Sequence, residues 1–77
     1  MKMKFLGSTS GGGSCPNVYE TDANTIVVQG GRVSDPELLA IARERGLPDH
    51  ETLVEIPREL VQYFPQELLD KYATGAR

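Results

Sequence analysis

The chain has 77 residues, of which 39% are hydrophobic and 25% are charged, and its formal net charge at pH 7 is −3. These proportions are typical of a globular protein, but a chain this short buries only roughly 60% of the surface that its unfolded form exposes. An acidic domain is repelled by phosphate backbones and anionic lipids, which argues against nucleic acid or a membrane as the partner. We therefore expect one small domain whose limited core is completed by a second copy, as a homodimer, or by another protein.

The cysteine content and hydrophobic runs indicate the compartment. Cys15 is the single cysteine, and a lone cysteine cannot form an internal disulfide. The lysines of residues 1–6 are not followed by the apolar run of a secretory signal, and no run approaches the ~20 residues that span a bilayer. We therefore expect a cytoplasmic, reduced protein.

The N-terminal part is rich in glycine and serine. Residues 7–14 read GSTSGGGS, and because glycine is costly to order this stretch predicts a flexible loop. Residues 1–6 leave three interpretations open: a short strand, a frayed tail and a segment introduced for expression. We group residues 1–14 as a flexible N-terminal segment and expect the single small domain to comprise residues 15–77.

Two β-strands are predicted at residues 18–21 and 25–29, because β-branched or aromatic side chains dominate both. The residues between them suit a three-residue hairpin loop in which Asn24 takes the left-handed conformation. The two glycines that follow permit a tight turn or a bulge. A further strand is predicted at residues 52–56, where side chains of alternating polarity succeed one another.

A helix at about 36–45 has the strongest signals at its ends. Two start signals overlap: Ser34 and Glu37 match a capping box, whereas Asp35 before a proline is an alternative cap. Gly46 suits a left-handed C-terminal cap. The apolar face of this helix comprises Leu38, Leu39, Ile41 and Ala42.

Two short C-terminal helices follow. The first begins at Pro57, and Pro65 divides it from the second because proline cannot donate a hydrogen bond to the preceding turn. The second helix covers about 66–73.

The predicted fold is α+β, with a short antiparallel β-sheet and helices packed on one of its faces. Its elements are the hairpin at about 17–29, the strand at about 52–56, the helix at about 36–45 and the two short C-terminal helices. The pattern fixes neither the number nor the order of the strands.

The side chains that could carry chemistry are few. Zinc needs four ligands, and Cys15 and His50 are the only cysteine and histidine, so we expect no metal site. The glycine run lacks the Lys-Ser or Lys-Thr that ends a nucleotide-phosphate loop. The carboxylates show no catalytic spacing and are interpreted as a solvated acidic face. We therefore expect no catalytic residue, no cofactor and no enzymatic activity; a small enzyme using Cys15 with His50 remains an alternative.

Aromatic side chains gather in the C-terminal helices. Such residues are either part of the core or, where exposed, anchors of a binding surface. The candidate partner-binding residues are Leu60, Tyr63, Phe64, Leu68 and Tyr72. A face or edge of the sheet, with Ile26, Val28 and Val54, is a further candidate contact surface.

Two resemblances bear on function. Residues 53–60, LVEIPREL, are similar to the strand-Ile-Pro-helix step of swapped-hairpin antitoxins and transition-state regulators, which implies a DNA-binding dimer. Over most of its length the chain resembles small actinobacterial proteins of the BldB-like type. Their pattern is a Ser/Gly-rich start, a cysteine, a short strand, a Val-rich strand and a strand that enters a helix through a Pro-x-Glu step. It matches residues 10–15, 18–20, 26–28 and 53–60.

The chain departs from the BldB-like pattern by an inserted helix at 36–45 and by the absence of the tryptophan common in the final helix. The resemblance implies a regulatory accessory protein, encoded beside helix-turn-helix regulators and acting on such a regulator or on a toxin-like protein. We accordingly expect a non-enzymatic protein-binding accessory. A swapped-hairpin DNA-binding regulator is the alternative, and a small enzyme using Cys15 is the second alternative.

Overall fold

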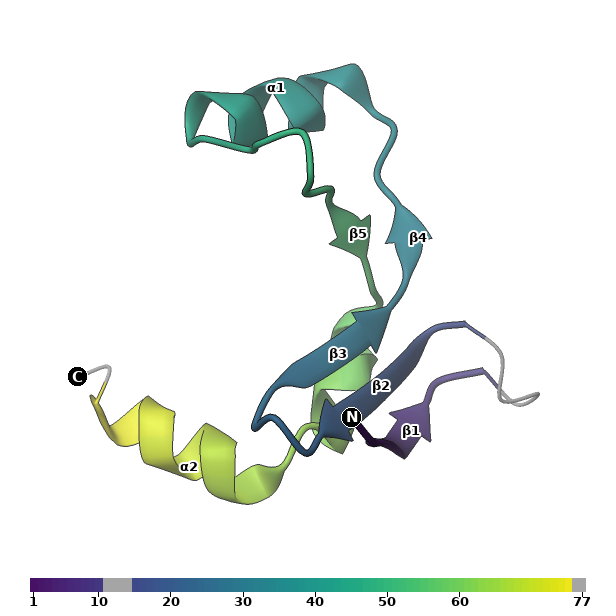
Figure 1. Ribbon diagram of the computed structural model, residues 1–77, viewed down its shortest axis with the longest axis vertical. Coiled ribbons are helices and arrows are strands. Elements are labelled where there is room, and N and C mark those ends of the chain that lie inside the picture. Colours follow the sequence, from purple (N-terminus) through teal and green to yellow (C-terminus); the bar gives the residue numbers. More distant parts are fainter. Residues whose placement is uncertain (11–14, 76–77) are drawn as a thin grey trace.

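The computed structural model describes residues 1–10 and 15–75 and has the α+β architecture predicted from the sequence (Figure 1). A three-stranded antiparallel sheet has the order β1-β2-β3, and a separate two-stranded sheet pairs β4 with β5. The elements in chain order are β1 (Met3–Ser8), β2 (Asn17–Thr21), β3 (Ile26–Gln29), β4 (Gly31–Arg32), α1 (Pro36–Glu44), β5 (Val54–Glu55), the 3₁₀ helix η1 (Arg58–Tyr63) and α2 (Gln66–Gly75).

Strands β2 and β3 form the predicted hairpin. Val18 lies opposite Val28, and successive residues alternate between the two faces of the sheet. In the loop, Asn24 has a φ of 64°, which is the left-handed conformation expected for it. The loop is closed by a hydrogen bond of 2.9 Å from the Thr21 amide to the Thr25 carbonyl.

Strand β1 is the third strand of the sheet. Phe5 pairs with Tyr19 of β2, and a bulge between Phe5 and Gly7 shifts the register. Of the three interpretations left open for the first residues, the strand is the one observed. Residues 3–8 thus belong to the sheet, although we had grouped them with a flexible segment. The flexibility predicted for residues 11–14 lies outside the described residues.

Strand β5 is shorter than the strand predicted at 52–56 and has another partner. Val54 and Glu55 pair with β4 and not with the hairpin. Gly30 shows how closely the chain passes here, because a Cβ on it would lie 2.5 Å from the carbonyl oxygen of Glu55 and 2.7 Å from Cγ2 of Ile56. Gly30, between β3 and β4, therefore marks the point where a narrow β4–β5 ribbon leaves the main sheet.

The core lies between the three-stranded sheet and η1. Val18 of β2 and Leu60 of η1 are both fully buried. Tyr63 lies so close to Gly7 that a Cβ on the glycine would overlap its ring. Helix η1 contacts β1 and β2, and in Figure 1 it lies behind the sheet. The prediction that the helices pack on one face of the sheet is right for η1, whereas α1 and α2 make no extensive contact with the sheet.

Both ends of α1 follow the local signals of the sequence. Asp35 is the N-cap, and its carboxylate accepts a hydrogen bond of 2.9 Å from the Glu37 amide. At the other end the Gly46 amide donates to the Arg43 carbonyl and the Leu47 amide to the Ala42 carbonyl. With Gly46 at φ 96°, these two bonds form a Schellman motif.

The chain as a whole has the shape of a C. The three-stranded sheet lies in the middle of the C. The β4–β5 ribbon leads from the sheet to α1 at one tip, and α2 forms the other tip (Figure 1). We call β4, α1 and β5, with their connections, the arm. The arm carries one buried apolar side chain, Val33, whose amide donates to the Leu53 carbonyl.

Candidate functional site

Three apolar surfaces are left uncovered by this fold. We call them the sheet patch, the arm patch and the C-terminal patch. The sheet patch comprises Met3, Phe5, Tyr19 and Val27; the arm patch comprises Leu38 and Ile41; the C-terminal patch comprises Val61, Phe64, Leu68, Leu69 and Tyr72.

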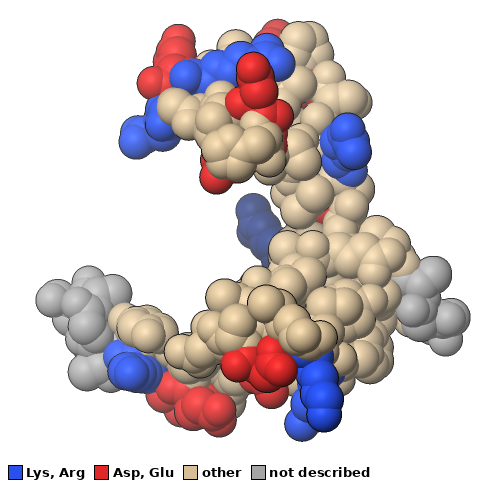
Figure 2. Space-filling model, in the orientation of Figure 1, with Lys and Arg blue, Asp and Glu red and all other residues tan. Residues whose placement is uncertain are grey.

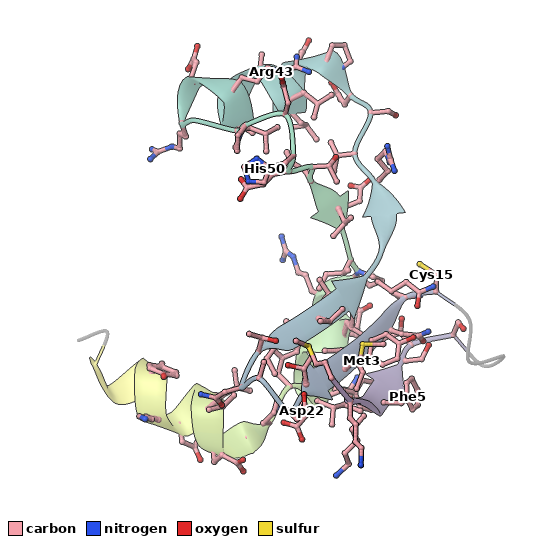
Figure 3. All side chains as sticks on the ribbon, in the orientation of Figure 1. Met3, Phe5, Cys15, Asp22, Arg43 and His50 are labelled. Carbon is pink, nitrogen blue, oxygen red and sulfur yellow. The ribbon has the colours of Figure 1, made fainter. Side chains whose placement is uncertain are left out.

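The sheet patch occupies the face of β1–β3 that η1 does not cover. Phe5, Tyr19 and Val27 lie opposite one another on the three strands, so they form a row across this face. The rings of Phe5 and Tyr19 meet edge to face with centroids 5.9 Å apart. Phe5 and Met3 are about half exposed, at 52% and 55%, and Figure 3 shows the two side chains together on β1.

A polar cluster borders the sheet patch. The side-chain amide nitrogen of Asn17, Nδ2, donates to the Tyr19 hydroxyl and to Oε1 of Gln29. The Tyr19 hydroxyl donates to the same Oε1 at 2.9 Å. Asn17 is 5% exposed, so the cluster fixes the Tyr19 ring from one end. The ring of Tyr19, in the middle of the apolar row, is therefore held in position by hydrogen bonds.

The arm patch lies on one side of α1. Leu38 and Ile41, three residues apart and thus neighbours on the helix surface, are 44% and 59% exposed. None of the residues of α1 is buried. Of the apolar face predicted from the sequence, Leu39 and Ala42 are half-buried, whereas Leu38 and Ile41 remain exposed.

The C-terminal patch contains most of the partner-binding residues predicted from the sequence. Leu60 is fully buried against the sheet and belongs to the core, not to the surface. Tyr63 is half-buried, with its ring against Gly7. Phe64 and Leu68 are half-buried, and Tyr72 is 65% exposed, with Nζ of Lys71 5.4 Å from its ring centroid.

The other residues predicted as contacts divide between surfaces. Ile26 and Val28 are half-buried and share the face of Val18, which η1 covers, whereas Val54 of β5 is 40% exposed.

The sheet patch was not predicted from the sequence. The signal that could have found it is the alternation of Met3 and Phe5 with lysines at residues 2 and 4, which is the period of a strand with one apolar face.

Cys15 and His50 are not brought together. Cys15 is exposed and free, and its thiol lies 3.6 Å from the Gln29 carbonyl oxygen, to which it donates. His50 stands on the loop after α1, 3.9 Å from the Glu51 carboxylate, with 81% of its side chain exposed. Figure 3 shows the two residues in different parts of the molecule, with the β4–β5 ribbon between them.

Residues 1–10 and 15–75 hold no cluster of three or more His, Cys, Asp or Glu side chains that could bind a metal ion. No helix in the part of the chain that the structure describes is long and apolar enough to cross a membrane. A hollow between the ends of β1 and β2 is lined by side chains of both signs, Lys2, Lys4, Glu20 and Asp22 among them, and contains no nucleophile paired with a base.

Charged side chains are mixed rather than segregated. On the face shown in Figure 2, blue and red side chains alternate over the outer side of α1, and both signs lie below α2. The surface between them, over the sheet and toward the opening of the C, is mainly uncharged. The chain thus presents largely uncharged surface bordered by charges of both signs. A protein interface is likewise depleted of charge at its centre and polar at its rim.

Comparison with known proteins gives no assignment: no protein-family model, curated protein or solved structure matches this chain.

Proposed function

We propose that the protein is a non-enzymatic protein-binding accessory that acts on a transcription regulator or a toxin-like protein. The observation that carries the proposal is the C-terminal patch, in which Val61 and Tyr72 are exposed and the other side chains half-buried, on a chain with a very small core. The class of partner rests on the resemblance to BldB-like proteins, which are often encoded beside helix-turn-helix regulators.

Helix α2 supports this role by its geometry. Leu68, Leu69 and Tyr72 lie on one side of the helix at spacings of three and four residues. Glu67 and Asp70 lie on the opposite side, so the helix is amphipathic. Because α2 makes no extensive contact with the sheet and Tyr72 is exposed, its apolar side can enter a groove on another protein, a common mode of helix recognition.

Tyr72 is the residue best placed to anchor a partner. It is 65% exposed, and an aromatic ring that becomes fully buried contributes much of the binding energy of a typical interface. The surrounding Phe64 and Leu68, half-buried in the free chain, would exclude water around it. The exposed free thiol of Cys15 fits a reducing, cytoplasmic compartment.

The direct test is a calorimetric titration of the purified chain with each helix-turn-helix regulator or toxin-like protein that its neighbouring genes encode. We expect binding, and we expect Tyr72→Ala to weaken it by at least tenfold, the equivalent of ~1.4 kcal/mol. Glu67→Ala is the matched control, because it removes an exposed side chain from the opposite side of the same helix. Equal affinities for the two variants would refute the role given to the C-terminal patch.

A gel-shift experiment addresses the DNA-binding alternative. Duplex DNA from the region upstream of its own gene is mixed with the chain at low salt, where phosphate contacts are strongest. We expect retardation only when the regulator is present. Retardation by the chain alone would overturn the proposal and favour a DNA-binding regulator.

A further inference from the structure

The arm patch and the sheet patch are both apolar, and both are exposed on the same chain. A helix with one apolar stripe and a sheet with one uncovered apolar face each bury that surface against another layer in a stable domain. Here α1 has no buried residue, and the sheet is covered by η1 on one side only. The arm holds α1 away from the sheet of its own chain (Figure 1).

The surface area of the chain shows how much burial is missing. The accessible surface is 6183 Å², whereas a compact monomer of 8.4 kDa has ~4,600 Å². The excess, about 1,600 Å², is about twice the ~800 Å² that each partner contributes to a standard interface. The radius of gyration agrees, at 14.3 Å against ~11.5 Å for a compact domain of this length.

The two patches fit each other in size. With nine residues, α1 is ~13.5 Å long, and the outer strands of a three-stranded sheet lie ~10 Å apart, so one helix crosses the whole row of Phe5, Tyr19 and Val27. The strand residues that share this face carry no charge: they are Met3, Phe5, Asn17, Tyr19, Thr21, Val27 and Gln29.

We propose that the protein forms a two-fold symmetric dimer in which α1 of each chain lies across the sheet patch of the other. Because each chain carries both surfaces, a two-fold axis pairs each helix with the sheet of the other chain. All four patches of the pair are then buried, and no further chain can add to the assembly. A different protein would need both a helix and a sheet face of the right spacing, which a second copy supplies without further requirement. The dimer leaves the C-terminal patch free and so is independent of the proposed function.

Sedimentation equilibrium across concentration gives the first test. We expect a mass twice that of the 8.4 kDa chain. Ile41→Glu, which places a charge in the interface twice per dimer, should raise the dissociation constant by about 100-fold or more. Arg43→Glu, on the opposite side of α1, is the matched control and should leave the dimer intact, as should Tyr72→Ala in the C-terminal patch.

A cross-linking experiment tests the arrangement without disturbing the fold. In a Cys15→Ser background, a chain with Ile41→Cys is mixed with a chain with Phe5→Cys and treated with a short bis-maleimide. We expect a linked pair between the two different chains. The same experiment with Arg43→Cys in place of Ile41→Cys should give less product, because residue 43 lies on the opposite side of α1.

Several results would overturn the inference. A monomer at every concentration would do so, as would a dimer that Ile41→Glu leaves unchanged. Equal cross-linking from residues 43 and 41 would show that α1 does not present its apolar side to the sheet. Dissociation by Tyr72→Ala would place the dimer interface on the C-terminal patch instead.

Discussion

Two adjacent glycines should respond to the same substitution with opposite signs. An alanine Cβ at Gly30 would lie 2.5 Å from the Glu55 carbonyl oxygen and 2.7 Å from Cγ2 of Ile56, distances that real Cβ contacts do not show. One of these contacts is to backbone, so the β5 strand itself must move. At Gly31 the same Cβ meets nothing within 4 Å.

The magnitudes follow from these distances. Overpacking of this kind destabilises a protein by ~1–3 kcal/mol, a large part of the ~4–11 kcal/mol expected for a domain of this length. Gly31 does not have a positive φ, so alanine there should stabilise by ~0.4–1 kcal/mol, chiefly by restricting the unfolded chain. The difference between the two variants is therefore ~1.5–4 kcal/mol.

Urea denaturation followed by circular dichroism measures this difference, with all proteins at one fixed concentration because association shifts the midpoint. With a slope of ~1 kcal/mol per molar urea for a small domain, Gly30→Ala should lower the midpoint by ~1–3 M, while Gly31→Ala should raise it slightly. Equal midpoints for the two variants would show that β5 does not pass Gly30 at the distance observed.

Further substitutions check other parts of the fold. Leu60→Ala should destabilise by ~2–5 kcal/mol because it empties a fully buried site, whereas Val61→Ala, at a residue 43% exposed, should change the unfolding free energy much less; similar losses in urea melts would contradict the assigned core. Asp35→Ala should remove ~1 kcal/mol with the N-cap of α1, and Ser34→Ala should be nearly neutral; the reverse order would restore the capping box as the true cap. Gly46→Ala should destabilise by ~1 kcal/mol because φ is 96° there, and an unchanged thermal midpoint would count against the Schellman motif.

Local signals predicted the elements whose ends are decided by neighbouring residues. The helix at 36–45 appears as α1 because Asp35 and Gly46 act within one turn of its ends. The hairpin is found where it was expected because its loop needs only Asn24 in the left-handed conformation. In both cases the physical cause lies within a few residues of the effect.

Pairings between distant residues were not predictable in the same way. The alternation at 52–56 indicates a strand but does not name its partner, and the close approach at Gly30 sends β5 to β4 instead of to the hairpin. Strand β1 was one of three interpretations because its pairing depends on a bulge after Phe5 that no sequence pattern marks.

The candidate site shows the same difference between what neighbouring residues determine and what the whole fold determines. Apolar spacing identified a face on each C-terminal helix, but spacing alone does not say what covers that face. Leu60 and Tyr72 illustrate the point, since both were predicted as contacts and one is fully buried while the other is 65% exposed. The exposure of α1 likewise follows from where the β4–β5 ribbon places it, which is a property of the whole chain (Figure 1).

The most direct test of a protein-binding function is hydrogen exchange on the chain, alone and with the helix-turn-helix regulator that binds it best in the titration. We expect the regulator to slow amide exchange across residues 61–72 and to leave the hairpin loop at residues 22–25 unchanged. Exchange in residues 61–72 that is the same with and without a saturating amount of the regulator would contradict the proposal.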